Sequence, residues 1–355
     1  MKIGILTQHF SLNYGGIIQN YALQQVLRKL GHEPLTFEHD TCYSRTWWLL
    51  RTVKQILRTR SFANLPQYPV YKGRVGQKNF IKFVLNNISS VPVRNFTPAL
   101  TKRYGIEAYV VGSDQVWRPA FNIGRLENMF LDFADDKVKK LSYAASFGTS
   151  EWEYTPDEES RCAALAKRFD AVSVREDSGV TLCKEHLGVE ATQVLDPTLL
   201  LDKEDYLKVC TDVPMSKPHV FVYSLVEKER AMVVARQIAT ARGMDVVSVE
   251  AGANVKPEDS IEKWMAEFRD ADFIVTDSFH GMVFSIIFNK PFNIVQNASA
   301  GNSRYTSLLS QLGLMDRIIT DVPNTAPIDW DDVNTSRNAM KEPSLDFLKQ
   351  NLTHR

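Results

Sequence analysis

Hydrophobic and polar positions switch between two periods along this chain, and their order predicts an α/β protein. Short apolar runs at residues 2–6 and 109–111 predict buried strands, because each run ends in a polar turn. Apolar residues at helical spacing over 18–30 predict a helix that ends at Gly31. A second series of strands and helices begins at residue 219. Two consecutive series predict two doubly wound, Rossmann-like domains that face each other across a cleft.

The domain boundary is predicted by a polar stretch at residues 201–218, which contains Pro214 and Pro218. A length of 355 residues agrees with two domains rather than one core. We therefore expect an N-terminal domain over residues 1–205, a C-terminal domain over 206–335 and a terminal helix over 336–355.

The composition is that of an ordinary globular protein, with 44% hydrophobic and 24% charged residues. No apolar run reaches the roughly 18 residues needed to span a bilayer, and the first residues are typical of a strand rather than of a signal peptide. The four cysteines lie far apart and form no Cys-x-x-Cys pair, which favours a reduced compartment and no structural zinc. These features predict a cytoplasmic protein.

Charge is distributed unevenly, although the net charge is zero. Residues 41–106 contain twelve Lys or Arg and no Asp or Glu, so the rest of the chain carries a net charge of −12. We interpret this stretch as a basic amphipathic insertion, in which tryptophans and basic residues alternate over about 45–60. The pattern predicts either peripheral contact with an anionic membrane, at its inner face, or a helix packed on the domain. No nucleic-acid-binding motif accompanies the basic residues, so nucleic acid is not an expected partner.

The clearest chemical signal is a strand–turn–helix whose turn, at residues 276–281, reads Thr-Asp-Ser-Phe-His-Gly. Ligands of open parallel sheets bind at the carboxyl ends of strands, and a helix amino end favours an anion. The turn therefore predicts a site for a small anionic substrate at which His280 transfers a proton. The alternative is a histidine with a purely structural role. A helix amino end disfavours the imidazolium, whereas a bound phosphate and carboxylate favour it, so substrate binding would charge His280.

Three other kinds of segment supply candidate residues, each with a plainer alternative. The turn at residues 13–16, Asn-Tyr-Gly-Gly, either lets a ligand approach the backbone closely or is a simple strand–helix turn. It lacks the dinucleotide-binding fingerprint. Asp114 either accepts the proton of a sugar hydroxyl or caps a helix together with Ser113. Arg175 and Arg304 either clamp a carboxylate or phosphate or pair with acids on the surface.

Together with further segments, these residues resemble the motifs of the polysaccharide pyruvyl transferase family, in order over about residues 1–310. The matching motifs lie at residues 13–24, 111–117, 142–148, 173–176, 196–198 and 276–281. The resemblance implies a fold similar to that of the two-domain GT-B glycosyltransferases. It also implies transfer of an enolpyruvyl-derived unit from phosphoenolpyruvate to a sugar, which forms a cyclic pyruvate ketal. Many family members have Asn-x-Gly-Asp at the first turn, where this chain has Gly15 and Gly16.

The resemblance also implies roles for the candidate residues. His280 is expected to be the catalytic acid, with Asp114 or Asp277 as the base that orients the hydroxyl. Phosphoenolpyruvate is expected to contact Arg175, Ser278, Phe279, His280, Gly281 and Arg304. The acceptor sugar is expected to contact Asn13, Tyr14, Gly15, Gly16, Gln19, Ser113, Asp114 and Trp117. No metal site and no cofactor are expected, because phosphoenolpyruvate is a co-substrate and the sequence contains no metal-ligand cluster.

The expected acceptor is galactose or another hexose or N-acetylhexosamine of a polymeric or polyprenyl-diphosphate-linked glycan, in surface polysaccharide biosynthesis. Two other functions are compatible with the same sequence. One is a nucleotide-sugar glycosyltransferase of the same architecture, and the other is a glycan-binding protein without catalysis. Consumption of phosphoenolpyruvate, of a nucleotide sugar, or of neither separates the three.

Overall fold

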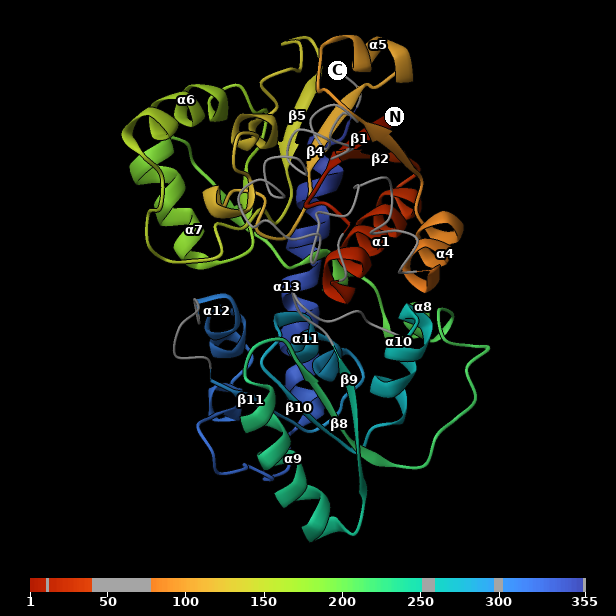
Figure 1. The fold of residues 1–355 in the computed structure, drawn as a ribbon. Coiled ribbons are helices and arrows are strands. Elements are labelled where there is room, and N and C mark those ends of the chain that lie inside the picture. Colours follow the sequence, from red (N-terminus) through yellow and green to blue (C-terminus); the bar gives the residue numbers. More distant parts are fainter. Residues whose placement is uncertain (11–12, 40–77, 251–258, 297–302, 354–355) are drawn as a thin grey trace, which may run out of the picture.

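The computed structural model describes residues 1–10, 13–39, 78–250, 259–296 and 303–353, and it contains two α/β domains (Figure 1). Each domain is built on a five-stranded parallel sheet. The predicted fold class, two doubly wound α/β domains, is therefore confirmed.

The N-terminal sheet has the order β3-β2-β1-β4-β5. Its strands are β1 (Lys2–Leu6), β2 (Glu33–His39), β3 (Ser90–Val93), β4 (Ala108–Val111) and β5 (Lys139–Ser142). Single bridges from Leu141 and Ala145 continue this sheet toward a small pair made of β6 (Ser173–Val174) and β7 (Thr192–Gln193). All four residues of β4 are buried, as expected for a strand covered on both faces.

Helices cover this sheet and end in recognisable caps. They are α1 (Tyr14–Lys29), α4 (Lys78–Asn87), α5 (Ala99–Tyr104), α6 (Pro156–Ala166) and α7 (Asp177–Leu182), with short turns η1 (Pro119–Phe121), η2 (Leu126–Phe130) and η3 (Cys183–Leu187). The side chain of Asn13 caps α1, and Thr155 and Glu158 form a capping box at the start of α6.

The described part of the acid-free stretch is integrated in this domain. Residues 90–93 form the edge strand β3, which pairs in parallel with β2, and Phe80 and Phe83 of α4 are buried in the core. Residues 40–77, which include the segment expected to contact a membrane, lie outside the described residues. Among the helices that are described, none is long and apolar enough to cross a bilayer.

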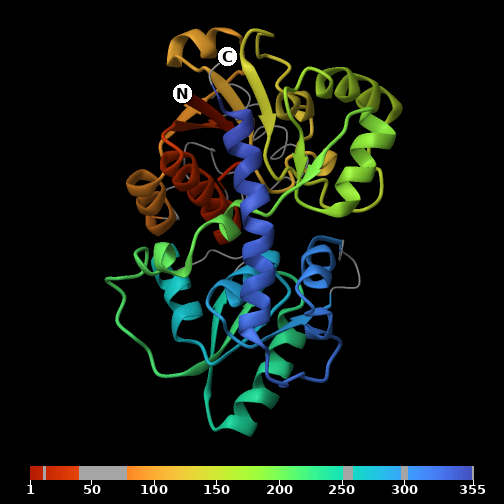
Figure 2. The same cartoon turned by 180° about the vertical axis from the view of Figure 1, so that it is seen from behind.

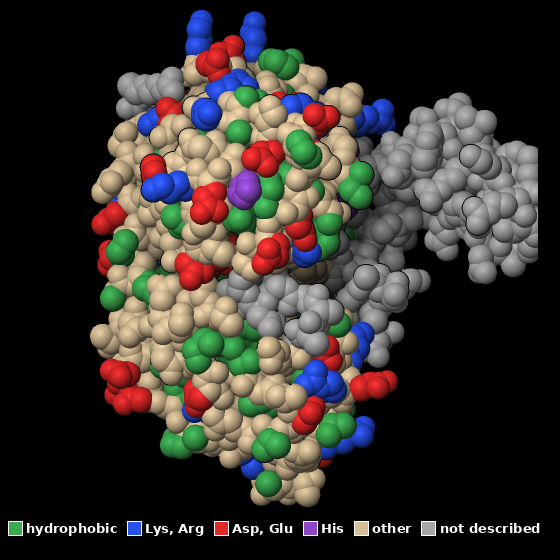
Figure 3. Space-filling view, turned by 90° about the vertical axis from the view of Figure 1, so that its left-hand side faces the viewer, with side chains coloured by type: hydrophobic (Ala, Val, Ile, Leu, Met, Phe, Trp, Pro, Cys, Tyr) green, Lys and Arg blue, Asp and Glu red, His purple; other side chains and the backbone are tan. Residues whose placement is uncertain are grey.

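The second domain follows η4 (Pro197–Leu200) and α8 (Lys203–Leu207), and its sheet has the order β12-β11-β10-β8-β9. The strands are β8 (His219–Ser224), β9 (Asp245–Glu250), β10 (Phe273–Thr276), β11 (Phe292–Val295) and β12 (Ile318–Ile319). The helices are α9 (Lys228–Arg242), α10 (Ile261–Asp270), α11 (Phe279–Ile287) and α12 (Ser303–Gln311), with the turn η5 (Met315–Arg317). The face drawn in Figure 3 carries acidic and basic side chains intermixed on both domains.

The last helix, α13 (Trp330–Asn351), begins in the second domain and returns to the first (Figure 2). Near its end, Phe347 packs against Tyr143 with ring centroids 6.3 Å apart, and Lys139 donates a hydrogen bond to the carbonyl of Thr353. The domains also meet through Tyr14, whose ring stacks on Trp264 at 5.1 Å between centroids. The two halves are thus joined by a continuous apolar core.

Candidate active site

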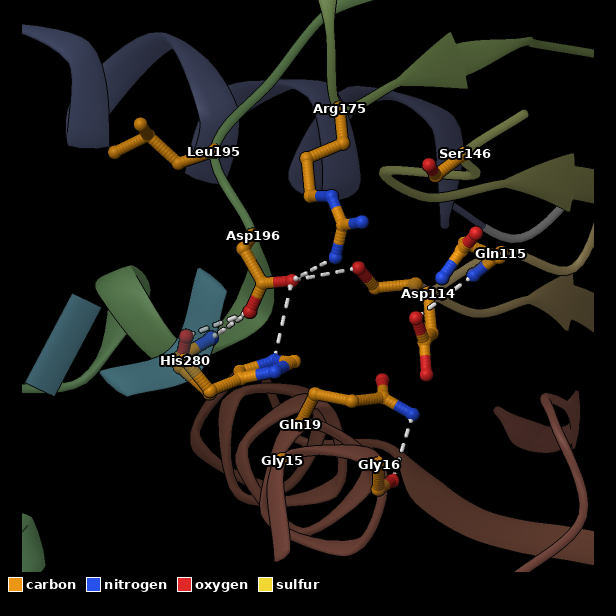
Figure 4. A network of polar contacts seen from close by, with 12 residues as sticks. Gly15, Gly16, Gln19, Asp114, Gln115, Ser146, Arg175, Leu195, Asp196 and His280 are labelled. Carbon is orange, nitrogen blue, oxygen red and sulfur yellow. Dashed lines mark hydrogen bonds and ion pairs between the residues drawn. The ribbon is translucent and has the colours of Figure 1, made fainter. Parts of the chain in front are cut away.

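The candidate site lies where the carboxyl ends of β4 and β6 and the amino ends of α1 and α11 meet (Figure 4). α11 belongs to the second domain, where it connects β10 to β11, and the other three elements belong to the first. The site therefore occupies the position where parallel sheets bind ligands. The sequence predicted this place from the polar turns that end each strand.

Asp196 is the centre of the polar contacts in this site. Its Oδ2 accepts hydrogen bonds from the Ser113 hydroxyl at 2.7 Å and from Nη1 of Arg175 at 3.1 Å. The same oxygen lies 3.9 Å from Nε2 of His280. Its other oxygen accepts from the backbone N–H and the hydroxyl of Thr198 at 3.0 and 2.6 Å. One buried carboxylate thus connects the two cationic candidates, Arg175 and His280.

Arg175 is 6% exposed and is held on three sides. Its Nε donates to Glu176 at 2.9 Å, Nη1 donates to Asp196, and its guanidinium lies 4.3 Å from the ring centroid of Phe279. Nη2 has no hydrogen-bond partner among the described residues. In Figure 4 this nitrogen points away from Leu195, toward the side on which Asp114 lies. A buried cationic donor without a partner is an anchor for a bound anion.

The buried charges of Arg175 and Asp196 each favour the ionised form of the other. Burial would lower the pKa of Arg175, but the carboxylates of Glu176, Asp196 and Asp114 outweigh burial and raise it. Burial would raise the pKa of Asp196, but the positive charges of His280 and Arg175 and the bonds from Thr198 outweigh burial and lower it. Arg175 is therefore a permanent cation and Asp196 a permanent anion at neutral pH.

His280 stands in the first turn of α11 and faces the amino end of α1. Ser278 caps α11 by accepting a hydrogen bond from the backbone N–H of Gly281 at 3.4 Å. The imidazole packs against Gly15, where an added β-carbon would lie 2.2 Å from Nδ1. The absence of a side chain at Gly15 is what lets this histidine sit between the two domains.

Gly15, Gly16 and Gln19 of α1, which are predicted acceptor residues, lie on the side of this group opposite Arg175 (Figure 4). Asn13 accepts hydrogen bonds from the backbone N–H groups of Gly15 and Gly16. The fully buried Gln19 donates from Nε2 to Thr7 and to the carbonyl of Gly16, while its Oε1 has no partner in the described chain. Asp114 has a φ of 77°, a left-handed backbone that is uncommon for a residue with a side chain. Such strain is typical of functional turns.

A cavity of about 230 Å³ borders Arg175, Asp196 and Phe279. It extends to Leu308 of α12 and Met340 of α13. Arg175 and Asp196 therefore border a space whose other lining residues are mostly apolar. In the described ranges, no cluster of three or more His, Cys, Asp or Glu is placed to hold a metal ion.

Several predicted site residues lie elsewhere or have their groups occupied. The carboxylate of Asp277 accepts four hydrogen bonds, from the Ser224 hydroxyl and from the backbone N–H groups of Leu225, Val226 and Glu227. It therefore anchors the loop after β8 instead of joining the group around Asp196.

Two predicted acceptor contacts are buried aromatic residues. Trp117 has no exposed surface, stacks on Phe130 and donates its indole N–H to the carbonyl of Met129. Tyr14 is also fully buried, and its hydroxyl donates to the carbonyl of Asp259 in the second domain. Both residues support the site from within the core and do not face it. Arg304 belongs to α12, but its side chain lies outside the described residues.

Asp196 and Glu176 are site residues that the local sequence pattern does not identify. Both follow strand-like segments, and Asp196 opens an Asp-Pro-Thr turn that was recognised only as a motif. A carboxylate at such a turn is equally typical of a helix cap, and Asp196 does cap η4. Its second role depends on Arg175 and His280, which are distant in sequence.

A known protein family matches most of the chain. The profile of the polysaccharide pyruvyl transferase family matches residues 13–299 of the chain. No curated protein sequence matches the chain.

Similar solved structures include UDP-GlcNAc 2-epimerase from Methanocaldococcus jannaschii, at 11% identity and a TM-score of 0.48, covering 96% of this chain and 93% of that one. UDP-GlcNAc 2-epimerase from Neisseria meningitidis bound to UDP-GlcNAc is 10% identical, with a TM-score of 0.48 and coverages of 100% and 95%. Arabidopsis thaliana UGT89C1 complexed with UDP-L-rhamnose is 8% identical, with a TM-score of 0.49 and coverages of 98% and 93%. These are distant likenesses.

Proposed function

Because this chain belongs to the polysaccharide pyruvyl transferase family, we propose that it transfers a pyruvyl unit from phosphoenolpyruvate to a sugar as a cyclic ketal. The acceptor is a hexose or N-acetylhexosamine, with galactose the first to test, in a polymeric or polyprenyl-diphosphate-linked glycan of a surface polysaccharide. No resident cofactor takes part.

The observation that carries the proposal is a pair of buried polar groups that have no partner among the described residues. Nη2 of Arg175 is a donor that suits a carboxylate or phosphate, and Oε1 of Gln19 is an acceptor that suits a sugar hydroxyl. An anion and a hydroxyl compound are the two reactants of ketal formation. A cavity of about 230 Å³ borders Arg175 on the side of Leu195 and α13, away from Nη2, and neither His280 nor Asp114 lines it.

The chemistry begins with protonation of the methylene carbon of phosphoenolpyruvate by His280, which makes C2 electrophilic. A sugar hydroxyl adds to C2, and its proton passes to Asp114. Phosphate then leaves with the electron pair of the C2–O bond and takes the proton held by Asp114. A second hydroxyl of the same sugar closes the ketal and gives its proton to His280, which restores the acid. The products are the pyruvate ketal and inorganic phosphate, so no oxidant or reductant is required.

His280 has the surroundings that a proton donor to carbon needs. The amino ends of α1 and α11 disfavour its protonated form, whereas the carboxylate of Asp196, 3.9 Å away, favours it. A bound phosphate and carboxylate would add to the second effect. Substrate binding would therefore charge the imidazole at the step that consumes its proton.

The test combines two readouts on the purified protein. Phosphate release from phosphoenolpyruvate is measured with galactosides and N-acetylhexosaminides, and each acceptor is examined by mass spectrometry for the added ketal. We expect both signals with one acceptor class, and their loss in His280→Gln. Consumption of UDP- or GDP-sugars instead would indicate a glycosyltransferase, and glycan binding without consumption of either donor would indicate a binding protein.

A further inference from the structure

A second cavity, of about 60 Å³, lies at the carboxyl ends of β1 and β2 in the N-terminal domain. Its apolar wall includes Phe37, Phe96 and Phe121. Its polar lining includes Gln8, His39 and Arg125. The space suits one substituent of a ligand better than a whole sugar ring.

This cavity adjoins the candidate active site through the end of β1. Gln8, which lines the cavity, donates to the carbonyl of Gln115, the residue after Asp114, at 2.7 Å. Thr7, which also lines it, donates to the carbonyl of Ser113 at 3.1 Å. The segment that carries Asp114 is therefore hydrogen-bonded on both sides to residues that line this cavity.

The ionisable residues among the described residues that line this cavity are all of the basic type. It contains one arginine and two histidines, and no Asp or Glu of the described chain lines it. Other arginines of this domain are paired with acids, for example Arg118 with Glu153 and Arg161 with Glu127. Arg125 makes no ion pair with any residue that the structure describes. A half-buried cation without an acid is a binding group for an oxyanion.

The aromatic wall is held in place independently of any ligand. The Phe121 ring is 49% exposed, and the guanidinium of Arg118 lies 5.3 Å from its centroid. Arg118 is itself fixed by two hydrogen bonds to Glu153 and one to Gln115. Asn122 is buried and donates to the carbonyls of Val116 and Arg118, which fixes the turn that carries Phe121. A preformed apolar wall beside a cation is typical of a small-ligand subsite.

We propose that this cavity binds an acidic group, a carboxylate or a phosphate, carried by the acceptor saccharide. The inference rests on the proposed function, because it places the same sugar between Asp114 and Arg125. It deepens that function by making the preferred acceptor an acidic glycan. Arg125 is then a specificity residue and takes no part in the bond-making steps.

The experiment measures equilibrium binding by titration calorimetry, which needs no turnover. Matched sugars are compared in the galactose, glucose and mannose series: the neutral methyl glycoside, the methyl glycoside of the uronic acid, and the hexose 1-phosphate. We expect one acidic form to bind at least about tenfold more tightly than its neutral counterpart. The uronic acid and the phosphate arms identify which acid is recognised.

Two variants assign the effect to the cavity. Arg125→Gln should remove the preference for the acidic form, whereas Arg103→Gln, an exposed arginine on α5 outside the cavity, should retain it. Circular dichroism checks that both variants are folded. Equal binding of all three sugar forms, no binding of any, or a preference that persists in Arg125→Gln would each overturn the inference. Failure of phosphoenolpyruvate turnover with an intact acid preference would instead refute only the proposed reaction.

Discussion

Gly15 of α1 packs so closely against His280 of α11 that a β-carbon added at Gly15 would lie 2.2 Å from the imidazole Nδ1. The two residues belong to different domains, and their contact sets both the place of the imidazole and the distance between two helix amino ends. A side chain at residue 15 would displace the ring or separate the domains.

We therefore expect Gly15→Ala to lower kcat by about 100-fold, because small displacements of a reacting group have effects of that size. Gly16→Ala is the matched change, since its added carbon would meet its nearest neighbour, an Asp114 oxygen, only at 3.7 Å. Gly16→Ala should leave the KM for phosphoenolpyruvate unchanged. In a His280→Ala background Gly15→Ala should have almost no further effect on activity; two additive losses would mean that Gly15 acts through another residue.

Asp196→Asn should destabilise the protein by about 3–5 kcal/mol, because it leaves the buried Arg175 with less compensating charge. Urea unfolding of the variant and the wild type measures the difference. Asp212→Asn is a suitable control, since Asp212 is exposed and makes no ion pair with any described residue. A loss no larger than that of the control would show that Glu176 alone compensates Arg175.

The pH dependence of stability should differ between the wild type and Asp196→Asn. The pKa of Asp196 is lowered in the folded state, so its contribution is fully present above its unfolded pKa and is lost as the pH falls toward the folded value. Below about pH 5 the wild type should therefore lose stability more steeply than Asp196→Asn. Parallel curves for wild type and variant between neutral pH and pH 3 would contradict the lowered pKa.

Asp114→Asn and Asp277→Asn should separate two carboxylates that the sequence treats alike as candidate bases. The carboxylate of Asp277 accepts hydrogen bonds from three backbone N–H groups. In Asp277→Asn the side-chain NH₂ would face one of these donors, so the variant should lose about 1–3 kcal/mol of stability. Asp114 accepts one local bond, from the backbone N–H of Gln115. Asp114→Asn should therefore unfold like the wild type but lower kcat. The reverse pattern would make Asp277 the base.

Arg175→Lys should raise the KM for phosphoenolpyruvate by roughly 10- to 100-fold, although the charge is kept. An ammonium group cannot bind Asp196, stack on Phe279 and still present a free donor, as the guanidinium does. Arg161→Lys, an exposed pair partner of Glu127, provides the control. An unchanged KM would remove Arg175 from the phosphoenolpyruvate site.

The sequence predicts the parts of the site that depend on local pattern. Strand ends followed by polar turns located Asp114, Arg175 and His280, because the carboxyl ends of parallel strands share one edge of a sheet. The contact between Gly15 and His280 could not be predicted, since it depends on how the two domains dock. The family resemblance implied that Trp117 contacts the acceptor, but its ring fills the core beside Phe130. The sequence also does not predict that α13 crosses from the second domain to the first, because an amphipathic pattern does not specify the surface on which a helix packs.

The path of α13 means that the polypeptide passes between the domains twice, once near α8 and once through this helix. Two rigid domains joined by a single linker can rotate about any axis. Two covalent connections restrict this rotation chiefly to the line that joins the connections. We therefore expect any opening between the domains to be a rotation about that line. Such a rotation would separate the amino ends of α1 and α11 and expose both of them at once.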